Sequence, residues 1–190
     1  MAATARHTRW VSACAPVRPA RYRYLLHVVL APALETGELT ARRTLAVIQK
    51  NPSRADAERS DPTAGKVEAW ARRNHFDAVL YTNLFAFRSP DPAALNRVAP
   101  ADAVGDDNDA AILAACAQAD VVVTAWGNPN GIERSLYNAR IEAVLALLRQ
   151  IGATVYCVGE PTRLGYPRHG LHWNGAATLR RHTGAPLQNV

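Results

Sequence analysis

TLAVIQKNPSRADAERSDPT, residues 44–63, is the stretch of sequence on which the prediction of the fold rests. It starts with a short apolar run containing β-branched residues, which is typical of a buried strand. Pro52 fixes its own φ and holds Asn51 in extended geometry just past the strand end. Asp61 followed by Pro62 has the pattern of a helix N-cap and first turn. This order predicts an α/β unit with a ligand site where the strand ends; the alternative is a connection that binds nothing.

Length and composition predict one domain. The 190 residues are enough for one α/β core, so we expect a single domain over 21–190 after a flexible basic arm over 1–20. No apolar run reaches the length of a membrane span and the start lacks a secretory pattern, so we expect no membrane contact and a cytoplasmic location. The three cysteines are far apart, which disfavours a disulfide framework or a zinc site.

The basic charge has two interpretations. The net charge is +6, the pI is near 9.6, and lysine occurs only at positions 50 and 66, so the charge comes almost entirely from arginine. Because the planar guanidinium suits phosphate, this favours a nucleic acid or nucleotide as the partner. The alternative is the codon bias of a high-GC genome, which also enriches alanine.

Apolar strand patterns alternate with helical ones along the rest of the chain. Strands are predicted near 45, 79, 122 and 155, and helices over 62–74, 110–119 and 136–151. Alternation of this kind predicts an α/β class, a three-layer sandwich with a central, mostly parallel four-stranded sheet. The strand-like segment 21–30 would lie at the edge of this sheet or form a hairpin with the strand near 45. Trp70, Cys116 and Cys157 are predicted to lie in the core.

Motifs for common cofactors are missing from the sequence. There is no GxGxxG after a strand and no GxxxxGK[ST], so no cofactor is expected. The segment GDDND, residues 105–109, precedes a predicted helix. Asp106, Asp107 and Asp109 complement the helix dipole there, and the alternative is that they hold a divalent cation.

The predicted sheet collects polar side chains where its parallel strands end. Right-handed crossovers bring all four strand ends to one edge. The residues gathered at this edge are Asn51, Ser53, Asn83, Arg88, Trp126, Asn128, Arg168, His169 and His172.

Several motifs together resemble a known family. AVIQKNPSRADAERSDPT, VLYTNLFAFRSPDP, GDDND, VVVTAWGN and GYPRHGLHW occur in the order seen in the domain of unknown function 1643. The resemblance runs from Tyr22 to Trp173 and implies no activity. The last motif departs from the family, which has His-Pro-Leu-Tyr where this chain has residues 169–172, His-Gly-Leu-His.

More remotely, the motif order is similar to that of the uracil-DNA glycosylase superfamily, especially its mismatch-specific branch. Asn51-Pro52 resembles the core of a Gly-Ile-Asn-Pro-Gly motif, and Thr82-Asn83 resembles the end of a second strand. The segment from His169 to Leu171 resembles the loop that wedges into DNA in that superfamily. This resemblance implies a uracil-DNA-glycosylase-like sheet and a hydrolase that acts on N-glycosidic bonds in DNA repair or modification.

The same resemblance implies roles for individual residues. Asn51 would position a water, Asn83 would read the base, and His169 would donate to the leaving base. Phe85 or Phe87 would stack on the base, arginines would bind phosphates, Leu171 would fill the gap left by a flipped nucleotide, and Asp56 or Asp61 would supply a carboxylate. The predicted catalytic residues are thus Asn51, His169 and Asp56, and the predicted substrate-binding residues are Pro52, Ser53, Asn83, Phe85, Phe87, Arg88, Trp126, Asn128, Arg163, Arg168 and Leu171.

Three functions remain open at this point. The first is a base-recognising enzyme that acts at an N-glycosidic bond of a nucleic acid or nucleotide. The second is a nucleic-acid-binding module without catalysis, which predicts salt-dependent binding. The third is an enzyme on a small nucleoside or another anionic metabolite, which predicts a closed pocket too narrow for a duplex and no continuous basic surface beside it. A groove lined by Arg88, Arg163 and Arg168 would favour the first two functions.

Overall fold

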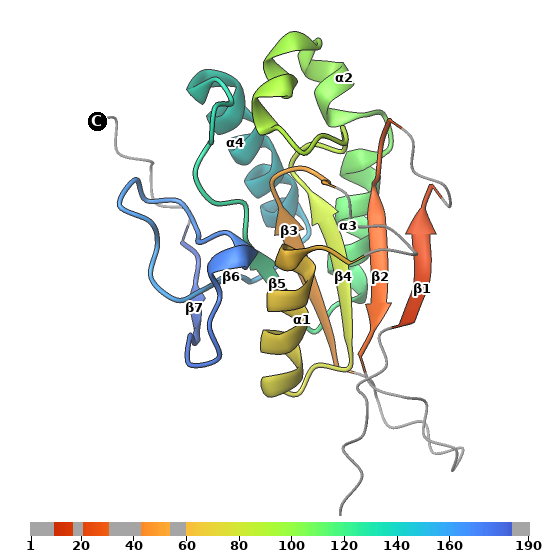
Figure 1. Ribbon diagram of the computed structural model, residues 1–190, viewed down its shortest axis with the longest axis vertical. Coiled ribbons are helices and arrows are strands. Elements are labelled where there is room, and N and C mark those ends of the chain that lie inside the picture. The colour runs from red at the N-terminus through yellow and green to blue at the C-terminus, as the bar shows by residue number, and fades with distance from the viewer. Residues whose placement is uncertain (1–9, 17–20, 31–42, 54–59, 184–190) are drawn as a thin grey trace, which may run out of the picture.

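The computed structural model describes residues 10–16, 21–30, 43–53 and 60–183. Seven strands form one sheet in the order β1-β2-β4-β3-β5-β6-β7 (Figure 1). The strands are β1 (Trp10–Ala15), β2 (Leu25–Val29), β3 (Thr44–Gln49), β4 (Ala78–Asn83), β5 (Val121–Thr124), β6 (Val155–Val158) and β7 (Leu179–Arg181).

The sheet mixes parallel and antiparallel pairs. β3 pairs in parallel with β4 and β5, and β5 pairs in parallel with β6, whereas β1–β2, β2–β4 and β6–β7 are antiparallel. The predicted α/β class is confirmed, but the prediction of a four-stranded sheet is wrong. The hairpin between the segment 21–30 and β3 is also wrong, because β4 lies between β2 and β3.

The strands β1 and β7 could not be predicted from the sequence because neither carries a clear strand pattern. β7 is the three-residue segment Leu-Arg-Arg, mostly exposed, so it carries no apolar alternation. β1 lies within the segment 1–20 that the sequence predicts as a flexible arm, and it pairs with β2 at the edge of the sheet. Residues 1–9 and 17–20 of that predicted arm lie outside the described residues.

The three helices predicted from the sequence begin and end within two residues of their predicted bounds. The helices of the structure are α1 (Pro62–Arg73), η1 (Pro92–Arg97), α2 (Pro100–Val104), α3 (Asn108–Gln118), α4 (Arg134–Gln150) and η2 (Gly170–His172), where η marks a 3-10 helix. The predicted N-cap of α1 is confirmed, since Asp61 Oδ1 accepts a hydrogen bond from Ala64 N at 2.8 Å. This cap fixes where the loop after β3 ends.

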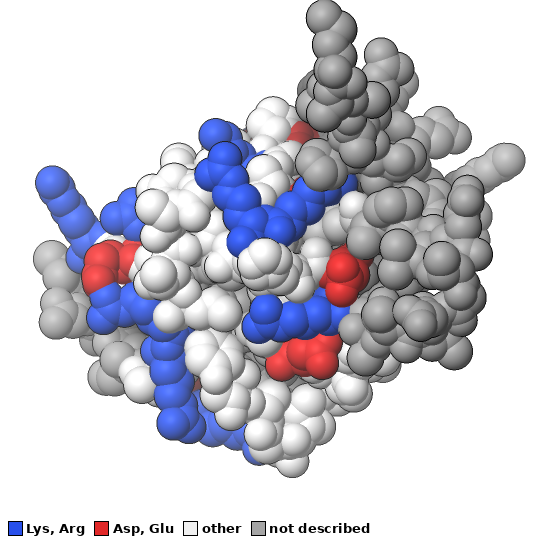
Figure 2. Space-filling view, turned by 90° about the horizontal axis from the view of Figure 1, so that it is seen from below, with Lys and Arg blue, Asp and Glu red and all other residues white. Residues whose placement is uncertain are grey.

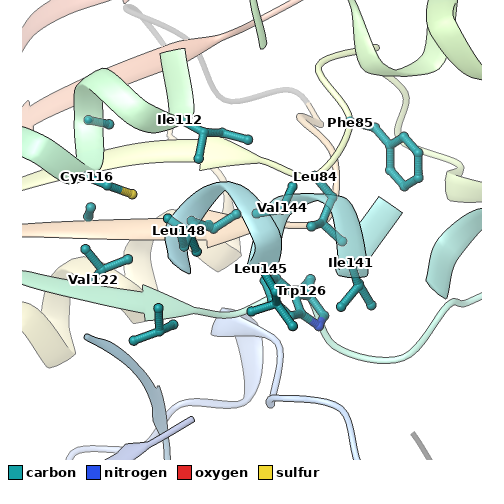
Figure 3. Close-up of a cluster of buried hydrophobic side chains, with 14 of the residues drawn as sticks. Leu84, Phe85, Ile112, Cys116, Val122, Trp126, Ile141, Val144, Leu145 and Leu148 are labelled. Carbon is teal, nitrogen blue, oxygen red and sulfur yellow. The ribbon is translucent and has the colours of Figure 1, made fainter. Parts of the chain in front are cut away.

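Hydrophobic clusters cover both faces of the sheet. Leu45 and Val47 of β3 pack in one cluster with Trp70 of α1, while Ala46 and Ile48 pack in the other. The second cluster joins the sheet to α3 and α4, as Figure 3 shows. Successive side chains of a strand point to opposite faces, so β3 is buried on both sides. The predicted core positions Trp70, Cys116 and Cys157 are confirmed.

Helices of the described chain are too short or too polar to cross a bilayer. No helix within residues 10–16, 21–30, 43–53 and 60–183 is long and apolar enough to span a membrane.

Candidate functional site

A polar cavity of about 350 Å³ opens where the parallel strands end. Gln49, Lys50 and Asn51 contribute to its wall from the end of β3, Asn128 from the loop after β5, and His169 from the loop before η2. We refer to it as the edge cavity. The βα unit predicted from residues 44–63 therefore leads into a cavity of the size that small ligands occupy.

Lys50 is a buried cation of the edge cavity. The residue is only 3% exposed, and its Nζ lies 5.9 Å from the ring centroid of Tyr137. Within the described residues, Nζ forms no hydrogen bond and no ion pair. Burial lowers the pKa of Lys50 to about 8, because an ammonium loses its hydration in this place.

His169 is a neutral imidazole in the same cavity. Burial, with smaller effects of Lys50 and His172, lowers the pKa of His169 to about 4, while Asp61 acts in the opposite direction. Its Nδ1 accepts a hydrogen bond from Leu171 N at 3.3 Å. The proton of the neutral ring is therefore on Nε2, and His169 offers an N–H donor rather than a charge.

Glycines and aromatic rings hold His169 in place. Gly127 has φ +68°, and a Cβ there would lie 2.8 Å from His169 Cβ, so only glycine allows this approach. A Cβ on Gly170 would lie 2.6 Å from Val67 Cγ2, which places η2 directly against α1. Trp173 packs on Trp70 with ring centroids 5.2 Å apart. The histidine is thus held by the loop after β5 on one side and, through Gly170 and Trp173, by the packing of the following segment on α1.

Two further charged groups face the cavity. Asp61 lines it while capping α1. Arg23 also lines it and is 3% exposed; burial lowers its pKa to about 10, while Asp61 acts in the opposite direction. The cavity therefore holds two buried basic residues and one described carboxylate.

Amide groups of the cavity wall lack partners. Gln49 Nε2, a donor, and Asn128 Oδ1, an acceptor, are both buried, and neither has a hydrogen-bond partner in the described structure. Asn51 differs, because its Nδ2 donates to Ser89 O at 2.8 Å and to Pro52 O at 3.3 Å. A buried amide without a partner costs about 1–3 kcal/mol, so Gln49 and Asn128 are suited to a ligand.

Asn83 is buried beside this wall. It is 0% exposed, both of its side-chain polar atoms lack partners, and it pairs in register with Gln49 across β3 and β4. Asn83 does not line the edge cavity; its register partner Gln49 does.

The structure brings five of the predicted site residues together. Lining the edge cavity are Asn51, Ser53, Asn128, His169 and Leu171. Leu171 is 41% exposed at the cavity mouth. Asp56 lies outside the described residues, and the alternative carboxylate Asp61 lines the cavity.

The other predicted residues lie away from the cavity wall. Phe85 is buried and stacks on Tyr137, and Trp126 is fully buried in the same cluster. Phe87 bridges to Tyr22, and Arg168 Nε donates to Glu160 O at 2.7 Å. The predicted site residues that do not line the cavity are Pro52, Asn83, Phe85, Phe87, Arg88, Trp126, Arg163 and Arg168.

The acidic segment before α3 forms contacts within the protein. Asp109 forms an ion pair with Arg140, whose Nε donates to Leu84 O at 2.6 Å. Asp106 and Asp107 are exposed. In the described part of the chain, no group of three or more His, Cys, Asp or Glu side chains is arranged to hold a metal ion.

Sequence reasoning did not single out Gln49, Lys50 or Arg23. A lysine directly after a buried strand, in a chain with only two lysines, is a signal that marks Lys50. Arg23 gives no such signal, because it comes to the cavity through the pairing of β2 with β4.

Comparison with known families places the chain. The family model of the protein of unknown function DUF1643 matches residues 23–171. The chain belongs to this family. The match extends from Arg23 nearly to the end of η2. It covers all residues that line the edge cavity except His172. No curated protein and no solved structure matches the chain.

Proposed function

We propose that the edge cavity binds a nucleobase and that the protein cleaves the N-glycosidic bond of a nucleotide unit. The observation that carries this proposal is the pair of unpartnered amide atoms, the donor Gln49 Nε2 and the acceptor Asn128 Oδ1. The edge of a pyrimidine presents a carbonyl oxygen beside an N–H, so one base can satisfy both atoms.

The charges around the cavity suit departure of a base. Cleavage leaves negative charge on the base and positive character on the sugar, and both need stabilisation in a site with little water. His169 Nε2–H and the ammonium of Lys50 would stabilise the departing base. Asp61 would stabilise the sugar. Asn51 Oδ1 accepts no hydrogen bond in the described structure, so it is available to orient an attacking water.

The remote resemblance to the uracil-DNA glycosylase superfamily supports the same assignment. It rests on Asn51-Pro52, Thr82-Asn83 and the segment 169–171. Asn51 and His169 both line the edge cavity, which is compatible with the roles that the resemblance implies for them. For the residue that reads the base, we propose Gln49 with Asn128 in place of Asn83, because Asn83 does not line the wall.

A free nucleoside or nucleotide is the second candidate substrate. Arg88, Arg163 and Arg168 do not line the edge cavity, which disfavours a long phosphate-binding groove beside it. Figure 2 shows the side of the molecule where β3 and β4 begin. Where residues are described on that face, basic side chains lie in separate groups with acidic ones between them. This face lies at the opposite end of the strands from the edge cavity, so its charges do not decide between the candidate substrates.

Measurement of released base tests the proposal. Purified protein would be incubated with single- and double-stranded oligonucleotides containing uracil or mismatched thymine and, in parallel, with pyrimidine nucleosides and nucleotides. We expect free base by chromatography, a rate about 100-fold lower in His169→Ala, and a large loss in Gln49→Ala.

Gln118→Ala is the matched control, since Gln118 is exposed on α3 and donates only to Ala114 O. It should release base at the wild-type rate. Absence of base release from every substrate, or release that is the same in His169→Ala and Gln49→Ala as in the wild type, would overturn the proposal. The polymer and monomer arms distinguish the two candidate substrates.

A further inference from the structure

The two lysines of this chain lie in opposite environments. Lys66 is exposed on α1, whereas Lys50 is 3% exposed at the wall of the edge cavity. The other 20 of the 22 Lys and Arg residues are arginines. A guanidinium stays protonated in proteins, but a buried amine can lose its proton and act as a nucleophile.

The surroundings of Lys50 increase the fraction of neutral amine. Its Nζ faces the ring of Tyr137 and forms no ion pair within the described residues. The other titratable groups that line the cavity are Arg23, Asp61, His169 and His172. With a pKa of about 8, roughly a tenth of Lys50 is unprotonated at pH 7, compared with under a thousandth for an ordinary lysine.

We propose that Lys50 is a nucleophile that condenses with the aldehyde carbon of a sugar opened at C1′. The idea rests on the proposed function, because release of a base leaves a hemiacetal at C1′, and this hemiacetal opens to an aldehyde. The geometry that carries the idea is a buried amine without a carboxylate partner, in a cavity of about 350 Å³ with an N–H donor on its wall.

The condensation balances without any further reagent. The lone pair of Nζ forms a bond to the carbonyl carbon, the π electron pair moves to oxygen, and one proton passes from nitrogen to that oxygen. The hydroxyl then leaves with the second nitrogen proton as water, and a C=N double bond remains. Nothing is oxidised or reduced. His169 Nε2–H stabilises the oxygen while charge develops on it.

Reductive trapping tests the inference without relying on base release. The protein would be mixed with sodium borohydride and either an oligonucleotide carrying a preformed abasic site or 2-deoxyribose 5-phosphate. Hydride adds to the imine carbon and makes a stable amine. Intact mass and peptide mapping then locate the adduct. We expect it on the peptide that contains Lys50, lost in Lys50→Arg and retained in Lys66→Arg.

The two substrates separate the sources of the aldehyde. An adduct at Lys50 with the oligonucleotide alone indicates a nucleic acid, and one with the sugar phosphate alone indicates a monomer; both support the inference. An abasic analogue with a tetrahydrofuran ring has no aldehyde and should give no adduct.

Other outcomes overturn the inference. No adduct, or an adduct distributed equally over Lys66 and the amino terminus, would exclude Lys50 as the nucleophile even if base is released. Conversely, an adduct at Lys50 without base release from any nucleotide would overturn the proposed N-glycosidase and leave the amine chemistry standing. Mapping in the wild-type protein gives the result even where a Lys50 variant fails to fold.

Discussion

Arg140 and Lys50 are both buried basic residues near the carboxyl ends of the strands, and their partners differ. Arg140 is 7% exposed, donates to Leu84 O and pairs with Asp109. Lys50 is 3% exposed and has neither a carboxylate nor a carbonyl partner in the described structure. Asn108 reinforces the first region by donating to Asn83 O and Leu84 O, each at 3.0 Å.

The difference separates structural from functional polar groups. Arg140, a buried charge whose hydrogen bonds are made, holds the loop after β4 in place. Removing it weakens the hydrogen bonding of the groups that it contacts. A buried charge without a partner costs stability, and a protein retains it where a ligand or a reaction uses it. The following variants test this contrast, in decreasing order of expected effect.

Arg140→Met should lower the free energy of unfolding by about 3 kcal/mol, because it removes the charged donor to Leu84 O, which keeps only Asn108 as a donor, and leaves Asp109 without its cation. Urea unfolding at pH 7 measures this. Arg149→Met on the exposed side of α4 is the control and should change stability by under about 0.5 kcal/mol. A similar small effect for Arg140→Met would show that its contacts do not stabilise the fold.

Lys50→Met should have the opposite sign and raise stability at pH 7 by about 2 kcal/mol. The folded pKa, about 8, lies below the ordinary 10.5, so protonation favours the unfolded chain. The contribution of Lys50 to wild-type stability should therefore increase from pH 8 to 10.5, and the advantage of Lys50→Met should shrink over that range. Cys116 and Tyr137, whose folded pKa values are raised by burial, destabilise both proteins alike above about pH 9, so the difference between wild type and variant isolates the lysine.

Urea unfolding at pH 7 and pH 10 tests this second variant, with Lys66→Met as the control for the loss of an exposed lysine. A loss of stability in Lys50→Met at pH 7 would mean that the amine has a stabilising partner, and the contrast with Arg140 would fail.

Gly127→Ala should cost about 1 kcal/mol more than Gly152→Ala. Both glycines have positive φ, +68° and +66°, so the backbone cost is shared. Only at Gly127 would the added Cβ meet His169, whereas nothing lies within 4 Å at Gly152. Thermal unfolding compares the two variants, and base release should fall only in Gly127→Ala. Equal effects would show that the approach of Gly127 to His169 is not required.

Strong local patterns predicted much of the fold. The apolar runs that form β3 and β4 and the Asp61-Pro62 start of α1 are readable because strand pattern and capping chemistry act within a few residues. β1 and β7 could not be read in this way. Both lie at the edges of the sheet, and their pairing depends on long-range neighbours rather than on alternation.

The site was predictable in position more than in composition. The end of β3 and the loop before η2 do meet, which brings Asn51 and His169 to one cavity. Side-chain direction decided the rest. Asn83 follows the second strand as expected, yet it is buried beside the wall rather than in it, and Phe85 turns into the core. The direction of a side chain at a strand end depends on the alternation of the strand and on the geometry of the loop that follows. The geometry of a loop cannot be predicted from its residue types.

The central position of β3 has a consequence for motion. Three strands lie on each side of it, and its residues Leu45 to Ile48 are fully buried. Amide hydrogens in such a strand exchange with solvent only when the whole domain unfolds. The wall that carries Gln49 and Lys50 is therefore attached to the slowest-exchanging part of the molecule. A ligand therefore meets these side chains already in position.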